Sequence, residues 1–237
     1  VRRLVSTLII PYLLVETTLQ MLPMHYDNDP PHLMILSPQW LGWFLAALVV
    51  WRLSTPVWRT LRYPITISVI ISLTAGLIEI PNVLALPKIL GLLPFYVLGL
   101  HFSNDIFERL ARTNVRITSW ILLIASFLGS LMWAEEWQER WPMSWMLWKH
   151  RYSEEPLLVG GIEGMITRGW FLTIAFVLTV AALSVIPHAR SWTTAFGGRT
   201  LYAYLLHGYV ILFLDRQFDL WSKLEPYGAW AVLGCMV

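Results

Sequence analysis

Two ionisable side chains stand inside long apolar stretches and are the first candidates for chemistry. Glu16 lies within residues 4–22, and His207 lies within residues 200–215, close to Tyr204. Charge is costly in hydrocarbon, so such residues are functional by default: an imidazole can move a proton and a carboxylate can bind a substrate. The alternatives are a neutral histidine bonded to helix backbone, and a glutamate that is protonated or close to the outer interface.

Residues 197–199, Gly-Gly-Arg, directly precede the stretch that carries His207. Flexible backbone, a cation and a helix N-terminus could together face an anion such as a phosphate. A turn with an arginine that sets membrane orientation is the plainer interpretation. Pro94 interrupts another apolar stretch, where a kink frees carbonyls that can line a cavity. The sequence contains none of the common soluble catalytic or metal-binding motifs, so we expect no metal.

Tryptophans recur at steps of four, four, four and three, at Trp133, Trp137, Trp141, Trp145 and Trp148. On a helix these indoles share one face, which is typical of a segment lying at the headgroups. A platform on which sugar rings stack is the alternative. We therefore predict that residues 135–165 form an extracytoplasmic, Trp-rich interfacial loop.

The elements that must position these residues are apolar helices. The 237 residues are 57% hydrophobic and 14% charged, with a mean hydropathy of +0.58, which excludes an ordinary soluble domain. A net charge of +2 gives no reason to expect nucleic acid, and the single cysteine permits no internal disulfide. We predict an all-α, polytopic transmembrane helix bundle forming a single domain over residues 1–237.

About 20 apolar residues cross a bilayer, which predicts about eight crossings in this chain. The predicted spans are 4–22, 39–55, 64–80, 89–102, 117–134, 166–187 and 200–215, with an eighth beginning near Tyr227. With the N-terminal side cytoplasmic, most of the 17 Lys and Arg residues fall in cytoplasmic loops. The second and fourth spans are short, so each could be tilted, broken or re-entrant.

Four short motifs follow one another along the chain. They are RR (2–3) with IIPYL (9–13), LSPQWLGWFL (36–45) with WRL (51–53), LPFYVLG (93–99), and GRTLYAYLLH (198–207). Their order and spacing resemble the acyltransferase 3 family of integral membrane proteins, and most closely its fucose 4-O-acetylase-like branch. The resemblance implies a bacterial inner-membrane bundle of about ten helices.

The resemblance also implies an activity, the transfer of an acyl group from acyl-CoA to a hydroxyl of a sugar or exported glycan. Acetyl-CoA is the expected donor, and the lipid bilayer and a carbohydrate acceptor are the other expected partners. The family's principal catalytic histidine and a later Phe-His-Met-Pro-like segment would both lie upstream of Val1. On this interpretation the N-terminal helices are missing from residues 1–237, and this segment alone is inactive.

Residue roles follow from the same resemblance. His207 is expected to have a supporting catalytic role, and the candidates for contact with coenzyme A phosphates are Arg2, Arg3 and Arg199. The candidates for substrate binding are Glu16, Trp40, Lys88 and Tyr204. Lys88 stands where relatives often carry arginine, which keeps the charge but loses the bidentate geometry.

The opposed interpretation is a transporter or flippase for a lipid-linked sugar or a small molecule. It shares the proline-kinked spans, the intramembrane Glu16 and the aromatic outer loop. It also predicts internal repeats with paired broken helices, and no such repeat is found in the sequence. A structural or sensory membrane protein is a third possibility. The acyl group, the acceptor, the oligomeric state and the source organism stay open.

Overall fold

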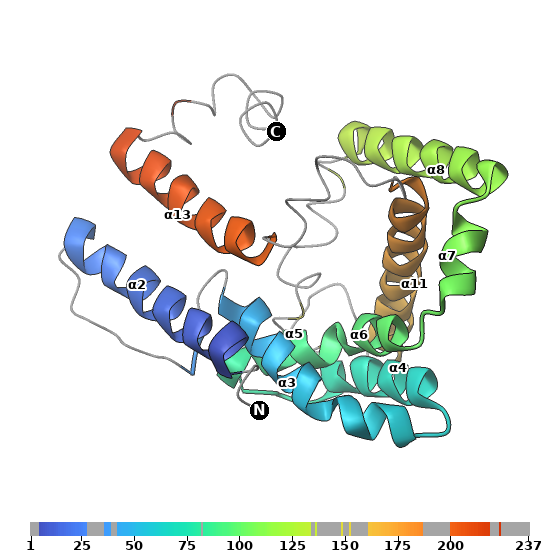
Figure 1. Ribbon diagram of the computed structural model, residues 1–237, viewed down its shortest axis with the longest axis horizontal. Helices are drawn as coiled ribbons and strands as arrows, with labels where there is room; N and C mark the ends of the chain where they lie inside the picture. Colours follow the sequence, from blue (N-terminus) through green and yellow to red (C-terminus); the bar gives the residue numbers. More distant parts are fainter. Residues whose placement is uncertain are drawn as a thin grey trace. The chain divides into compact units, whose positions relative to one another are not determined.

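The computed structural model describes residues 5–27, 36–38, 42–81, 83–133, 136, 148, 152, 161–186, 200–218 and 223 (Figure 1). Every regular element in these ranges is a helix. The chain divides into two compact units. The first unit comprises Val1–Gly42 with Arg190–Val237, and the second comprises Trp43–Ala189.

The first unit contains a π-helical turn, η1 (Val5–Ile9), and two α-helices, α2 (Ile10–Asp27) and α13 (Thr200–Phe218). The buried residues of α2 recur at helical spacing: Tyr12, Val15, Glu16, Leu19 and Gln20. This i, i+3, i+4, i+7, i+8 pattern forms one face. α13 is hydrogen-bonded to α2 through Tyr209, whose hydroxyl pairs with that of Thr18 and also donates to the Val15 carbonyl at 3.2 Å.

The second unit contains most of the helices. They are α3 (Gly42–Thr60, whose first residue belongs to the first unit), α4 (Pro64–Thr74), η2 (Ala75–Leu77), η3 (Val83–Ala85), α5 (Leu86–Gly91), α6 (Leu93–Leu100), α7 (Asn104–Leu110), α8 (Thr113–Met132) and α11 (Gly161–Val185). Pro64 stands in the first turn of α4, where the missing N–H costs no helical hydrogen bond.

The break between α5 and α6 is centred on Leu92, where the backbone has φ −94° and ψ 0°. Pro94 follows in the first turn of α6, and since a proline has no N–H to donate, it favours a new helix over continuation of α5. The η3–α5 segment and α6 meet at an angle of 63°. The sequence left the segment predicted at 89–102 open as tilted, broken or re-entrant, and the structure shows a break between Gly91 and Leu93.

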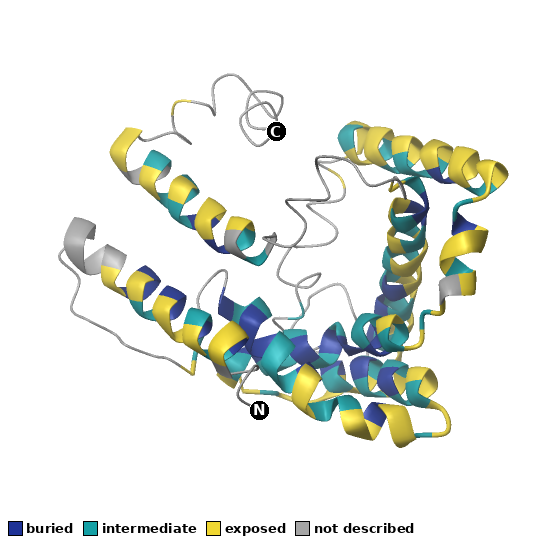
Figure 2. Ribbon diagram, viewed as in Figure 1, coloured by how far each residue is buried: buried dark blue, intermediate teal, exposed yellow. Residues whose placement is uncertain are grey.

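The core of the second unit joins α3 to α5 and α6 (Figure 2). Its buried members are Ala47, Trp51, Trp58, Ile89, Leu93 and Val97. Trp51 links the helices of this core. Its indole N–H donates a hydrogen bond of 3.1 Å to the Ile89 carbonyl, and its ring stacks on that of Tyr96, with 5.4 Å between the ring centroids. A tryptophan contributes most when both its ring and its N–H find partners.

The described residues do not confirm eight crossings, and the span predicted to begin near Tyr227 lies outside them. Within the described ranges, α8 and α11 are long and apolar enough to cross a membrane, and the bent pair would be a third if it counts as one span. α4 has only 11 residues between Pro64 and the tighter turn at η2. α2 contains Glu16 and Gln20, and α3 contains Arg52 and Arg59. These polar side chains lower the mean hydropathy of the two helices, and neither helix is a candidate span. The apolar stretch of α13 covers only Ala203–Leu214.

Candidate functional site

An arginine is buried in the apolar helix α11. The side chain of Arg168 is 2% exposed. Its guanidinium carbon lies 4.6 Å from the ring centroid of Tyr152 and 5.3 Å from that of Trp148. Aromatic faces attract a cation, and most strongly where water is excluded. These three residues are called the Arg168 cluster below.

Tyr152 is the most constrained member of the Arg168 cluster. Its hydroxyl donates a hydrogen bond of 2.7 Å to the Leu73 carbonyl, at the end of α4. Burial raises the pKa of the Tyr152 phenol, and the Arg168 guanidinium opposes this by its charge and by a hydrogen bond. Buried polar groups need such partners, because an unsatisfied one costs about 1–3 kcal/mol.

Glycines make room for the aromatic rings of the Arg168 cluster. A Cβ at Gly164 would lie 2.3 Å from Cγ of Tyr152, and one at Gly76 would lie 2.3 Å from its Cζ. A Cβ at Gly91 would lie 2.4 Å from Cδ1 of Trp148. Such distances are far inside van der Waals contact, so α11, η2 and α5 each present bare backbone to a ring. The cluster therefore ties three helical segments of the second unit together.

Chemically, the Arg168 cluster provides a permanent positive charge within apolar helices. A guanidinium does not lose its proton in proteins, and it can bind carboxylate or phosphate with two parallel hydrogen bonds. Ionisable residues inside membrane helices are expensive and are functional by default. The cluster is therefore the strongest candidate site in the second unit, as an anion-binding or helix-positioning centre.

The first unit buries a carboxylate. Glu16 is fully buried, and the Gln20 amide donates to its Oε1 at 2.7 Å. A Cβ at Gly42 would lie 2.0 Å from the other oxygen, Oε2, so the carboxyl group packs directly on glycine backbone. The structure therefore places Glu16 inside the first unit, and its predicted role in substrate binding stays a prediction.

Tyr204 and His207 are brought together on α13. They are three residues apart on one helix, and their ring centroids lie 5.4 Å apart. Tyr204 is half-buried, whereas His207 is exposed. The imidazole is therefore accessible, and the tyrosine ring restrains its orientation.

The other predicted site residues are distributed more widely. Lys88, on α5 in the second unit, is half-buried and holds its ammonium 5.1 Å from the ring centroid of Trp43. Four predicted residues lie outside the described ranges: Arg2, Arg3, Trp40 and Arg199. Within the described residues, no group of three or more His, Cys, Asp and Glu side chains could hold a metal ion.

Of the predicted tryptophan stripe, Trp133 is exposed but Trp148 is half-buried and contacts Arg168. The other three indoles lie outside the described residues. Arg168 was not singled out as a candidate from the sequence. The available signal was the position of this arginine near the start of an apolar stretch, at 166–187.

No protein-family model matches the chain, and neither a curated protein nor a solved structure matches it.

Proposed function

We propose that this chain functions in a membrane-bound O-acyltransferase that moves an acyl group from acyl-CoA to a hydroxyl of a sugar or exported glycan. Acetyl is the proposed acyl group, and the proposed location is a bacterial inner membrane. Such a reaction needs a base to take the proton of the hydroxyl and donors to stabilise the oxyanion. The observation that supports the proposal is the exposed imidazole of His207 restrained by Tyr204 on α13.

His207 is assigned a supporting role in this proposal, in which it positions the substrate or orients a second catalytic group. An imidazole suits either role because it both donates and accepts hydrogen bonds near neutral pH. Arg2, Arg3 and Arg199 are the proposed contacts to coenzyme A phosphates, since arginine binds phosphate bidentately. Buried Arg168 is not part of this assignment, because its guanidinium packs between aromatic rings.

The test is mass spectrometry of O-acetyl groups on surface glycans from cells that lack the gene. The cells are complemented with the wild-type gene or with the His207→Ala or His101→Ala variant. His101 is the matched control: it is also exposed, and its Nδ1 lies 2.9 Å from the Val97 carbonyl at the end of α6. We expect the wild type and His101→Ala to restore acetylation, and His207→Ala to lower it by up to about 100-fold, as for a misplaced reactant.

Two results would contradict the proposal at different levels. Full acetylation by His207→Ala would remove this residue from the mechanism. Acetylation that does not depend on the gene would reject the acylation of surface glycans altogether.

A transporter or flippase is the second candidate, and the 63° break between the η3–α5 segment and α6 favours it. Broken helices build substrate sites in transporters, where they occur as corresponding pairs in two repeats. The described residues contain one such broken helix, and no second one that corresponds to it. Purified protein in vesicles separates the two functions: consumption of acetyl-CoA identifies the enzyme, whereas sugar movement without consumption identifies the transporter.

A further inference from the structure

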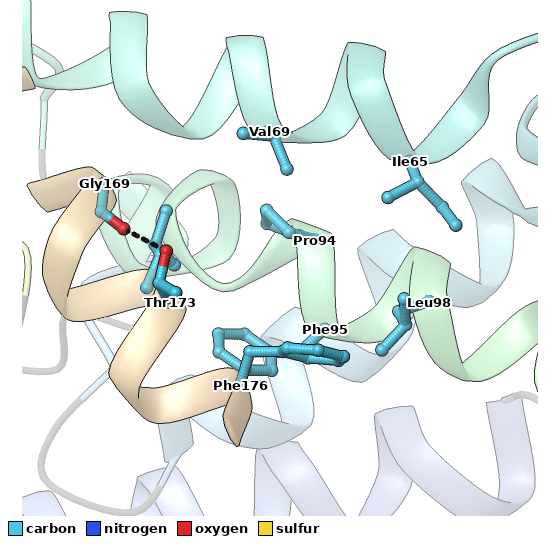
Figure 3. A pocket seen from close by; sticks show the side chains of 9 residues that line it. Ile65, Val69, Pro94, Phe95, Leu98, Gly169, Thr173 and Phe176 are labelled. Atoms are coloured by element: carbon cyan, nitrogen blue, oxygen red, sulfur yellow. Dashed lines mark hydrogen bonds between the residues drawn. The ribbon is translucent and has the colours of Figure 1, made fainter. Parts of the chain in front are cut away.

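The second unit contains a cavity of about 250 Å³ between α4, α6 and α11 (Figure 3). Ile65 and Val69 project from α4 toward α6, which carries Pro94, Phe95 and Leu98 (Figure 3). The α11 side consists of Gly169, Leu172, Thr173 and Phe176. Among the described residues, the cavity lining therefore contains no ionisable side chain.

Of the described lining residues, Thr173 alone has a polar side chain, and its hydroxyl already has a partner. The Thr173 hydroxyl donates to the Gly169 carbonyl at 2.8 Å, within its own helix. A polar ligand would find no charged side chain here, and water in such a cavity needs two to four polar partners. The lining is therefore suited to a hydrocarbon.

The cavity opens to the outside of the second unit. Pro94 and Leu172 are buried and form its floor, whereas Ile65 and Phe176 are each 38% exposed and lie at its mouth. The surface beside the mouth is also apolar, since Val177 is 42% exposed on α11 and Ile70 is 55% exposed on α4. The mouth is thus continuous with a surface suited to lipid.

The depth of the cavity along α11 identifies the source of the hydrocarbon. α11 has 25 residues from Gly161 to Val185, so Thr173 is its central residue. A helix of this length covers about 37 Å, more than the hydrocarbon core of about 30 Å. With α11 centred across a bilayer, the cavity opens near the middle of the membrane, about 15 Å from either interface. The acetyl group of a donor whose coenzyme A stays in water does not reach that depth, whereas the chain ends of lipids lie there.

We propose that this cavity binds the end of one acyl chain of a membrane phospholipid. An apolar cavity of about 150 Å³ holds benzene, so a volume of about 250 Å³ accommodates on the order of ten carbon atoms. The chain fills a space that the three helices leave open, and it thereby supports their packing on one another. This inference is independent of the proposed acyltransferase activity, and its test requires no turnover.

The test uses the full chain in vesicles of phosphatidylethanolamine and phosphatidylglycerol. The vesicles include a phosphatidylcholine that carries a photoactivatable diazirine at the end of one chain. After illumination, adducts on the peptides with Phe95 and Phe176 are measured by mass spectrometry. They are divided by the adducts on the exposed face of α8, which includes Ile121 and Leu128.

Two substitutions fill the cavity from different helices: Val69→Phe on α4 and Leu98→Phe on α6. The matched control is Val177→Phe, which is exposed on α11 and does not line the cavity. We expect either filling variant to lower the labelling ratio by about tenfold, and the control to keep it. A variant is compared only if its size-exclusion elution volume and its Tm match those of the wild type. Two filling positions are used so that one variant can still be tested if the other does not fold normally.

Two outcomes would overturn the proposal. One is an unchanged ratio in a filling variant that folds normally. The other is cavity labelling by a diazirine-bearing decanoyl-CoA without labelling by the phospholipid, which would place a donor chain in the cavity instead.

Discussion

Gly164→Ala tests whether the rings of the Arg168 cluster are held as tightly as the structure indicates. The added Cβ would lie 2.3 Å from Cγ and 2.6 Å from Cβ of Tyr152. Tyr152 cannot easily move away, since its hydroxyl is bound to Leu73 and its far side packs on Gly76. Overpacking of this kind costs about 1–3 kcal/mol. Replacing a helical glycine with alanine stabilises the helix by about 0.5–1 kcal/mol. The cost of overpacking exceeds this gain over most of its range, so the substitution should destabilise the protein.

Gly169→Ala is the matched control on the same helix. Its Cβ would meet only Cδ2 of Leu73 at 3.8 Å, which is ordinary contact. Both variants gain the same helix propensity, so the difference between them isolates the overpacking of about 1–3 kcal/mol. For a protein of 150–250 residues, the Tm changes by about 2–4 °C for each kcal/mol of stability. The Tm of Gly164→Ala should therefore lie about 2–12 °C below that of Gly169→Ala.

The assay is size-exclusion chromatography of detergent-solubilised protein after heating, with the detergent held constant. Equal melting of the two variants, or a lower Tm for Gly169→Ala, would refute the packing of Tyr152 on α11. A lower Tm for both variants would show instead that α11 tolerates no side chain at either glycine.

Two further predictions concern single hydrogen-bonding groups. Ser72→Ala removes a buried bond of 2.7 Å to the Gly91 carbonyl and should cost about 0.5–1.5 kcal/mol; Ser130→Ala, which loses an equally short but exposed bond, should leave the Tm unchanged. A large loss for Ser130→Ala would contradict this account. Because the pKa of Tyr152 is raised in the folded state, stability should fall as pH rises above the ordinary value of 10.0. The Tm of Tyr152→Phe should fall less steeply there, and parallel curves for variant and wild type would argue against the raised pKa.

The helical class was predictable from the sequence, and a break was one of the three alternatives left open for the segment at 89–102, because both depend on local chemistry. Apolar composition favours helices in lipid, and Pro94 cannot continue the hydrogen-bond pattern of a preceding helix. The number of crossings was not predictable in this way. Hydropathy extends the third predicted span over 64–80, whereas α4 ends at Thr74 and a short 3-10 turn follows. Helix ends depend on backbone geometry, and composition alone does not fix them.

The Arg168 cluster was not predictable because its contacts join residues far apart in the chain. Spacing on a helix identifies residues that share a face, such as Tyr204 and His207 on α13. It cannot show that Tyr152 packs against Gly164, or that its hydroxyl reaches the carbonyl of Leu73. Glycines of this kind become informative only once the ring that occupies the space above them is known.

Each unit thus stabilises one ionisable group in its own way. Glu16 receives a hydrogen bond from Gln20 and packs on the bare backbone of Gly42. Arg168 lies against aromatic faces, and a Cβ at Gly76 would be only 2.6 Å from its Nη1. An isolated buried charge is strongly destabilising, so such local contacts are what makes burial tolerable. Because those contacts come from within each unit, a change at one glycine should weaken its own unit first.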